Sequence, residues 1–247
     1  MMRGFGGIGK LGNETGLKLL AAASMAADHT GWLLFPGCEA LRIIGRLAFP
    51  IFAYYIYIGC LRTHSKGRYG GRILALGLAC MIVWHLISGQ VYGNILITFS
   101  LSIGVISLMQ RIKQRFIQPA AQLAGGAAAA GLCLLPLWAL TDRIVIDYGL
   151  WGIYVPVLPE LLRTGTAPRV PAGRRVGLED IGFGFGLWGL AQQYGGIQYA
   201  SLAALALLVW FRAGPVSYRL PKRFLYYFYP IHFLVIYGIY LAMQSGR

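Results

Sequence analysis

The chain contains 247 residues, of which 57% are hydrophobic and only 12% are charged, and its formal net charge is +14. An ordinary soluble domain carries about a quarter charged residues, so this composition excludes a water-soluble protein with a core of normal size. The Lys and Arg residues lie in short clusters between apolar runs instead of on one face or tail. This pattern argues against a nucleic-acid-binding protein and is typical of a polytopic membrane protein.

Apolar runs of helical length follow one another along the whole chain. A transmembrane helix needs about 20 mostly apolar residues, and these runs lack the alternation of a membrane β-barrel. The sequence therefore predicts an all-α fold, a single transmembrane helical bundle over 1–247 with about nine spans. The first is interpreted as a retained span, because no small-residue cleavage site follows it. The predicted spans are 17–35, 41–61, 71–89, 93–110, 118–140, 148–162, 177–193, 196–212 and 223–243.

The distribution of basic residues predicts the orientation of these spans. Alternate connections contain eighteen Lys and Arg residues, whereas the connections between them contain only Arg143. Basic residues accumulate on the cytoplasmic side, so we expect a cytoplasmic N-terminus and an external C-terminus. The Gly-rich segment 177–196 also fits a re-entrant segment. The eighteen are Arg3, Lys10, Lys18, Arg62, Lys66, Arg68, Arg72, Arg111, Lys113, Arg115, Arg163, Arg169, Arg174, Arg175, Arg212, Arg219, Lys222 and Arg223.

Four ionisable residues lie close together in the first two predicted spans, Asp28 and His29 inside the first and Arg42 and Arg46 at the start of the second. A charge at the bilayer centre costs roughly 2.5–3.5 kcal/mol. Asp28 and His29 are neighbours, but adjacent helical residues point about 100° apart, so each needs a partner from another helix. Arg42 and Arg46 share one helix face. Arg46 reaches a depth similar to that of Asp28, so we expect an Asp28–Arg46 ion pair beside His29. These charges either form a catalytic site or only hold two helices together.

Further polar residues and helix breakers mark the second, fourth and last predicted spans. Pro50 cannot donate to the Arg46 carbonyl and is expected to kink the second span. Asn94 heads a polar stripe with Thr98 and Ser102, which fits either function or interhelical hydrogen bonding. In the last span, Tyr229 and His232 flank Pro230, which cannot donate to the Tyr226 carbonyl. Tyr229, with Tyr226 and Tyr227, either lines a path for a polar substrate or belongs to an interfacial aromatic belt.

Metal and haem sites find little support in the sequence. Cys38, Cys60, Cys80 and Cys133 are scattered without a C-x-x-C spacing, so the sequence predicts neither a zinc site nor a disulfide framework. His85 and His232 are the residues that a haem-binding alternative would use as axial ligands.

Four motifs together resemble the TraX family of membrane proteins. They are MAADHTGWLLFP, LRIIGRLAFPIFAYYIYIG, GNILITFSLSIG and YYFYPIHFLVIYG. The resemblance implies an acyltransferase of the cytoplasmic (inner) membrane that uses acetyl-CoA to acetylate the N-terminal amine of conjugative pilin subunits. The TraX family also resembles larger membrane acyltransferases that transfer acetyl groups to sugars. In those relatives a histidine in an early span is the expected catalytic group, and the resemblance places it at His29 here. A peptide or a glycan is therefore the implied acceptor.

These observations lead to one hypothesis and one rival. In the first, His29 is the general base, Asp28 and Arg46 organise the catalytic site, and Arg42, Arg46 or Asn94 stabilises the oxyanion. Tyr229 and His232 then contact the substrate. In the rival, the protein is a proton-coupled transporter or flippase, and Asp28, His29 and Arg46 form a proton relay.

Overall fold

The computed structural model describes residues 14–165, 176–212, 220–221 and 223–245. Within these residues the protein is helical, and the one β-type contact is an isolated parallel bridge between Gly93 and Ile146. Several of the basic residues that predict the orientation lie outside the described part, namely Arg3, Lys10, Arg169, Arg174, Arg175, Arg219 and Lys222. The helices are α1 (Glu14–Leu33), α2 (Glu39–Gly45), α3 (Ala48–Arg62), α4 (Lys66–Ser88), α5 (Ile95–Lys113), α6 (Pro119–Arg143), α7 (Gly149–Tyr154), α8 (Leu158–Leu162), α9 (Leu178–Tyr194), the 3-10 helix η1 (Gly196–Leu202), α10 (Ala203–Arg212) and α11 (Phe224–Ser245).

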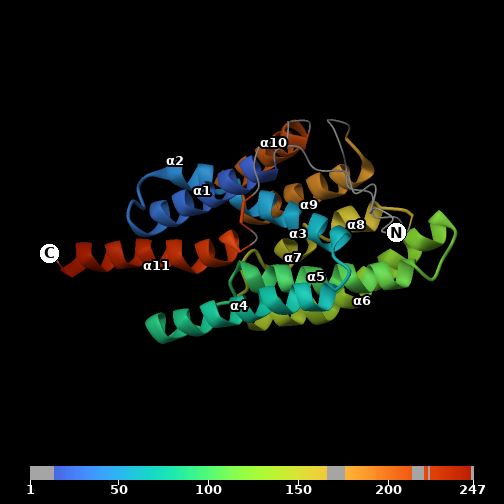
Figure 1. Ribbon diagram of the computed structural model, residues 1–247, viewed down its shortest axis with the longest axis horizontal. Helices are drawn as coiled ribbons and strands as arrows, with labels where there is room; N and C mark the ends of the chain where they lie inside the picture. Colours follow the sequence, from blue (N-terminus) through green and yellow to red (C-terminus); the bar gives the residue numbers. More distant parts are fainter. Residues whose placement is uncertain (1–13, 166–175, 213–219, 222, 246–247) are drawn as a thin grey trace, which may run out of the picture.

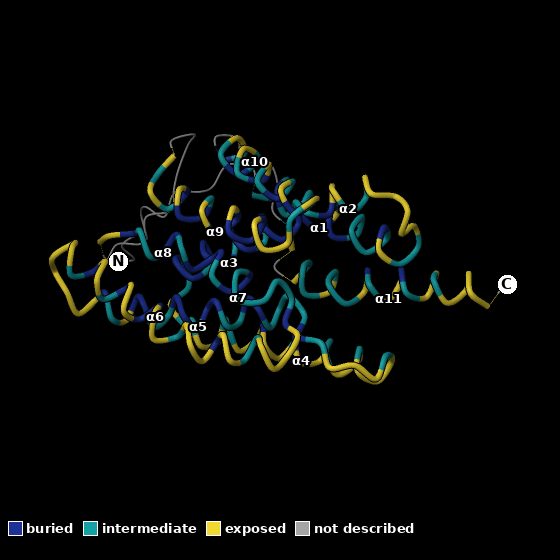
Figure 2. Tube along the Cα trace, turned by 180° about the vertical axis from the view of Figure 1, so that it is seen from behind, coloured by how far each residue is buried: buried dark blue, intermediate teal, exposed yellow. Residues whose placement is uncertain are grey.

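The helices form two outer groups with a buried middle layer (Figure 1). Helices α4, α5 and α6 lie side by side along one edge, and α1, α2 and α10 lie along the opposite edge. Helices α3, α7, α8 and α9 lie between these groups, where Figure 2 shows most of the buried chain. Helix α11 packs against α1 and projects beyond one end of the bundle.

Five stretches of the described chain are long and apolar enough to cross a membrane. They are Glu39–Arg62, which comprises α2 and α3, and the helices α4, α5, α6 and α11. Over its most apolar 18 residues, Glu39–Arg62 is 61% buried inside the bundle, against 11% for the corresponding parts of α4 and α11. The first stretch is thus central, whereas α4 and α11 present apolar faces outward. The helical fold is confirmed for the described residues, and five stretches able to cross a membrane support a multi-pass membrane protein. Nine spans and a cytoplasmic N-terminus stay predictions.

The second predicted span is interrupted where Pro50 requires it. Helix α2 ends at Gly45 and α3 starts at Ala48, with Arg46 and Leu47 between them. Because Pro50 has no N–H and its ring would clash with the carbonyl four residues earlier, the continuous ladder stops at Arg46. The helix is thus interrupted at the predicted place, and the interruption puts Arg46 at a helix end.

The sixth predicted span, 148–162, is not one helix. It forms α7 and α8, which are 6 and 5 residues long, because Pro156 and Pro159 interrupt the ladder. Val155 and Val157 in the break are fully buried. An irregular backbone of this kind is tolerated at membrane depth when protein surrounds it.

A buried ion cluster joins α8 to α5. Glu160 has no exposed side-chain surface and accepts hydrogen bonds from both Arg163 nitrogens Nε and Nη2 at 2.9 and 3.0 Å and from Gln110 at 2.9 Å. Lys113 Nζ donates to the carbonyls of Glu160, Leu161 and Arg163 at the end of α8, where a cation is favoured. Lys113 and Arg163 are therefore structural residues and not solvated loop charges.

Candidate functional site

Asp28 binds two arginines from the neighbouring helix. Its Oδ2 lies 2.9 Å from Arg42 Nη1, and its Oδ1 lies 2.7 Å from Arg46 Nη2. Helices α1 and α2 can approach this closely because Gly31 and Gly45 have no side chain. A Cβ on Gly45 would collide with the Asp28 side chain, and one on Gly31 would lie 2.9 Å from Leu41 Cβ. The predicted Asp28–Arg46 ion pair is present, and Arg42 completes a three-residue cluster.

The two arginines differ in how much of each guanidinium remains available. Arg46 uses all three nitrogens: Nη2 bonds to Asp28, Nη1 to Gln198 Oε1 at 3.2 Å and Nε to the Arg42 carbonyl at 3.3 Å. Arg42 uses Nη1 alone, for the carboxylate and the carbonyl of Asp28, and its Nε and Nη2 have no partner among the described residues. Its side chain is also more exposed, 28% against 12% for Arg46. Arg42 is therefore the arginine able to receive an anion.

His29 is paired with His232 of α11. His29 Nδ1 lies 2.8 Å from His232 Nε2, and the two ring planes are nearly parallel, with an interplanar angle of 15° and centroids 5.0 Å apart. His232 Nδ1 lies 2.8 Å from the Phe228 carbonyl oxygen. Because a carbonyl only accepts, neutral His232 carries its proton on Nδ1 and accepts at Nε2. His29 must then donate from Nδ1, which leaves its Nε2 lone pair as the basic atom of the pair.

This pairing revises one expectation about His29. Helix geometry correctly excluded a hydrogen bond between Asp28 and His29, but His29 is not free beside the ion pair. Its partner is 203 residues away in the sequence. Tyr229, one turn earlier on α11, packs edge-on against His232 with ring centroids 6.1 Å apart. The structure thus joins His29, His232 and Tyr229 in one group.

A second acidic group lies close enough to Asp28 and Arg46 to feel their charges, and it was not among the predicted site residues. Asp147 lies between α6 and α7, and its carboxylate accepts a 2.8 Å hydrogen bond from Tyr92 while its carbonyl accepts one from Thr98. Burial raises the pKa of the Asp147 carboxyl to about 6, although the bond from Tyr92 opposes this shift. Tyr148 follows with φ at +58°, a conformation that non-glycine residues rarely adopt. Such backbone strain is often found at functional sites.

The remaining candidates lie apart from these contacts. Asn94 caps α5 by accepting from the Leu96 N–H, and its amide nitrogen donates to the Gly77 carbonyl of α4 at 2.7 Å, so one polar group caps α5 and the other joins α5 to α4. Ser102 donates to the Ile153 carbonyl and joins α5 to α7. His85 lies on the exposed face of α4, whereas His232 is buried against His29.

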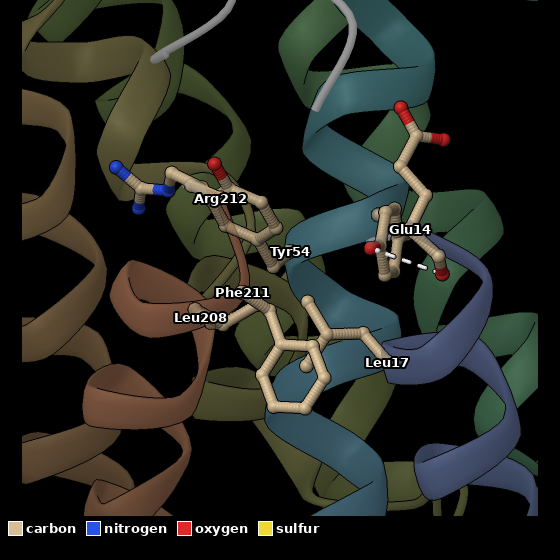
Figure 3. A pocket seen from close by; sticks show the side chains of 7 residues that line it. Glu14, Leu17, Tyr54, Leu208, Phe211 and Arg212 are labelled. Carbon is tan, nitrogen blue, oxygen red and sulfur yellow. Dashed lines mark hydrogen bonds between the residues drawn. The ribbon is translucent and has the colours of Figure 1, made fainter. Parts of the chain in front are cut away.

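A small pocket elsewhere in the bundle is distinct from this cluster. Glu14, Leu17, Tyr54, Leu208, Phe211 and Arg212 line it together with Tyr55 (Figure 3). Arg212 forms a buried ion pair with Asp180 and lies over the Tyr54 ring. Glu14 and His29 are 15 residues apart on α1, about 22 Å at the helical rise. Among the described residues, no group of three or more His, Cys, Asp or Glu side chains is arranged to hold a metal ion.

Comparison with known proteins identifies the family. The chain is 24% identical to the probable fimbrial assembly protein FimC, serogroup H1, of Dichelobacter nodosus, over 92% of this chain and 96% of that protein. It is 46% identical to the uncharacterized protein RP591 of Rickettsia prowazekii (strain Madrid E) over 39 residues, 16% of each chain. No solved structure matches. The family model described as TraX protein matches residues 13–240, which confirms the resemblance seen in the motifs, and the chain therefore belongs to the TraX family.

Proposed function

We propose that this protein is an acyltransferase of the cytoplasmic membrane that moves an acetyl group from acetyl-CoA to an amine or hydroxyl acceptor. The observation that carries the proposal is the geometry of His29. It is a histidine with one nitrogen held by His232, the other nitrogen basic, and the available guanidinium of Arg42 bound to the adjacent residue Asp28. A base and a cation in one partly buried site meet the two needs of acyl transfer.

In the proposed reaction, His29 Nε2 removes a proton from the acceptor while the acceptor nitrogen or oxygen attacks the thioester carbonyl carbon. A bond forms between acceptor and acetyl carbon, and the carbonyl oxygen becomes an oxyanion near Arg42 Nε and Nη2. Collapse of this intermediate breaks the carbon–sulfur bond. The departing CoA thiolate takes the proton from the His29 imidazolium, so the enzyme returns to its starting state.

Asp28 and Arg46 have a positioning role in this proposal. Asp28 holds both guanidinium groups, and Arg46 is further fixed by Gln198 and by the Arg42 carbonyl. A guanidinium that is already oriented needs no reorganisation when the oxyanion develops. Removing Arg46 should therefore lower activity by misplacing Arg42.

The acceptor is proposed from the family and from one relative. The Dichelobacter relative is named a fimbrial assembly protein, and the family resemblance implies acetylation of a pilin N-terminus. We therefore propose a pilin-like peptide amine as acceptor, with a glycan hydroxyl as the alternative. Acetyl-CoA would approach from the basic, predicted cytoplasmic side along the start of α11, where Tyr229 precedes His232.

The test is acetyl transfer by the purified protein. It is incubated with labelled acetyl-CoA and either a pilin N-terminal peptide or a glycan, and free CoA and labelled product are measured. A general base contributes about 10²–10⁴-fold, so His29→Gln should lose at least about 100-fold. His85→Gln is the matched control, because His85 is exposed on α4. Wild-type rates from folded His29→Gln would refute the proposal.

The transporter alternative makes a different prediction for the same preparation. A proton relay needs groups that pass a proton on at both ends, but the His29–His232 chain ends at the Phe228 carbonyl, which only accepts. Because the hydrogen-bond chain stops at this carbonyl, it favours a role for His29 as a fixed base and not as a step in a proton path. Substrate-coupled proton movement in liposomes without release of CoA would support the transporter instead.

A further inference from the structure

The outer face of α4 combines a basic groove with an apolar stripe. The groove, about 550 Å³, lies where α3 passes into α4 and is lined by Thr63, His64 and Ser65 together with Arg68 and Arg72. No acidic side chain lines it. The α3–α4 connection thus offers hydroxyl groups and two guanidinium groups around one hollow, which is the donor set that recognises a phosphate.

Both guanidinium groups are anchored through Nε alone. Arg68 Nε donates to Ser65 Oγ at 3.0 Å, and Arg72 Nε donates to the Arg68 carbonyl at 3.3 Å. The Nη groups of both residues have no partner among the described residues. Gly71 lies between them, and a Cβ built on it would meet nothing within 4 Å. The groove is therefore open to a group of phosphate size.

The same helix face becomes apolar directly beyond the groove. Ala75 lines the groove one turn after Gly71, and Ala79, Ile82 and Leu86 continue its stripe at helical spacing. Ile82 and Leu86 are 56% and 78% exposed, and Figure 2 shows α4 exposed along the edge of the bundle. Basic groups at one end and an exposed apolar stripe above them match an amphiphile better than a soluble anion.

We propose that α4 binds one anionic phospholipid, with its phosphate between Arg68 and Arg72 and its acyl chains along Ala75, Ala79 and Ile82. Basic pockets beside transmembrane helices bind anionic lipid head groups in this way. The site lies on the outside of the bundle and is independent of the proposed acyl transfer. A soluble phosphate is the competing ligand, and the experiment separates the two.

The experiment titrates detergent-purified protein with dioleoylphosphatidylglycerol and with zwitterionic dioleoylphosphatidylcholine, and counts bound lipids by native mass spectrometry. We expect one tight phosphatidylglycerol and a weaker affinity for phosphatidylcholine. The double variant Arg68→Gln/Arg72→Gln should lose about 30-fold in affinity for phosphatidylglycerol. The matched control Arg111→Gln/Arg115→Gln removes the same charge from exposed positions at the end of α5 and should leave that affinity unchanged.

A second pair of variants tests the groove without removing an arginine. Gly71→Glu inserts a carboxylate into open space and should abolish the preference for phosphatidylglycerol, whereas Gly71→Gln, of the same size, should preserve it. Three outcomes would overturn the proposal. They are equal affinity of the wild type for both lipids, equal losses in both double-arginine variants, and displacement of the lipid by millimolar inorganic phosphate.

Discussion

His232 should act by holding His29 in one tautomer, and two substitutions separate this role from simple packing. Glutamine at 232 can place its Oε1 where the imidazole Nε2 lies, so it can still accept from His29 Nδ1. Asparagine is one methylene shorter and can reach only the position of Nδ1, where it keeps the contact with the Phe228 carbonyl. Glutamine thus keeps the acceptor for His29 and gives up the contact with Phe228, whereas asparagine keeps the Phe228 contact and leaves His29 Nδ1–H without its acceptor.

The expected magnitude follows from the lost acceptor. In His232→Asn the His29 Nδ1–H is left without its 2.8 Å partner, and an unsatisfied buried donor costs about 1–3 kcal/mol. At 1.36 kcal/mol for each factor of ten, the active arrangement of His29 becomes about 5- to 150-fold rarer. His232→Gln should retain most of the activity, because its carbonyl replaces the acceptor.

The assay measures the initial rate of CoA release for the wild type and both variants. Nitrogen-15 NMR of labelled histidine provides a readout that needs no turnover, since the wild type should show an unprotonated Nε2 on His29. Equal rates for the two variants, or a rate for asparagine above that for glutamine, would refute the tautomer argument. Absence of acetyl transfer in the wild type would instead refute the proposed function, and the NMR test would still stand.

Two further predictions concern the approach of α1 and α2. Asp28→Asn leaves the guanidinium groups of Arg42 and Arg46 without their carboxylate, so we expect a loss of about 3 kcal/mol in stability, seen as a lower thermal midpoint in detergent; an unchanged midpoint would contradict the ion-pair geometry. Gly45→Ala places a methyl group against Asp28 and should destabilise the protein, whereas Gly104→Ala, with open space around its Cβ, should be neutral or stabilising. Equal thermal shifts in these two variants would contradict the close approach.

Some of the site could be predicted from sequence because it depends on helix geometry alone. Asp28 and Arg46 lie on consecutive helices joined by a short connection, so rise per residue and the position of the turn bring them to similar depth. Pro50 predicted the break at Arg46, because its missing N–H affects only the hydrogen bond to the carbonyl four residues earlier. The sequence did not predict that Arg46 uses all three guanidinium nitrogens while Arg42 uses one, since this difference depends on Gln198 from a distant part of the chain.

Other expectations failed because hydropathy and counts of charged residues register neither helix breaks nor tertiary contacts. The run 148–162 has the hydropathy of a span, but its two prolines break it into short helices buried by their neighbours. Lys113 and Arg163 count as loop charges in a tally of basic residues, yet both are bound to α8. Hydropathy measures the transfer of a segment into an apolar phase and does not distinguish lipid from protein around it.

By itself, the sequence determined the membrane class, the helical fold and the Asp28–Arg46 pair, because composition, hydropathy and helix rise are local properties. Only the tertiary structure decided that His29 meets His232, since 203 residues separate them and no periodicity relates α1 to α11. That contact also assigns the basic nitrogen of His29, because the Phe228 carbonyl can only accept and so fixes the direction of both hydrogen bonds.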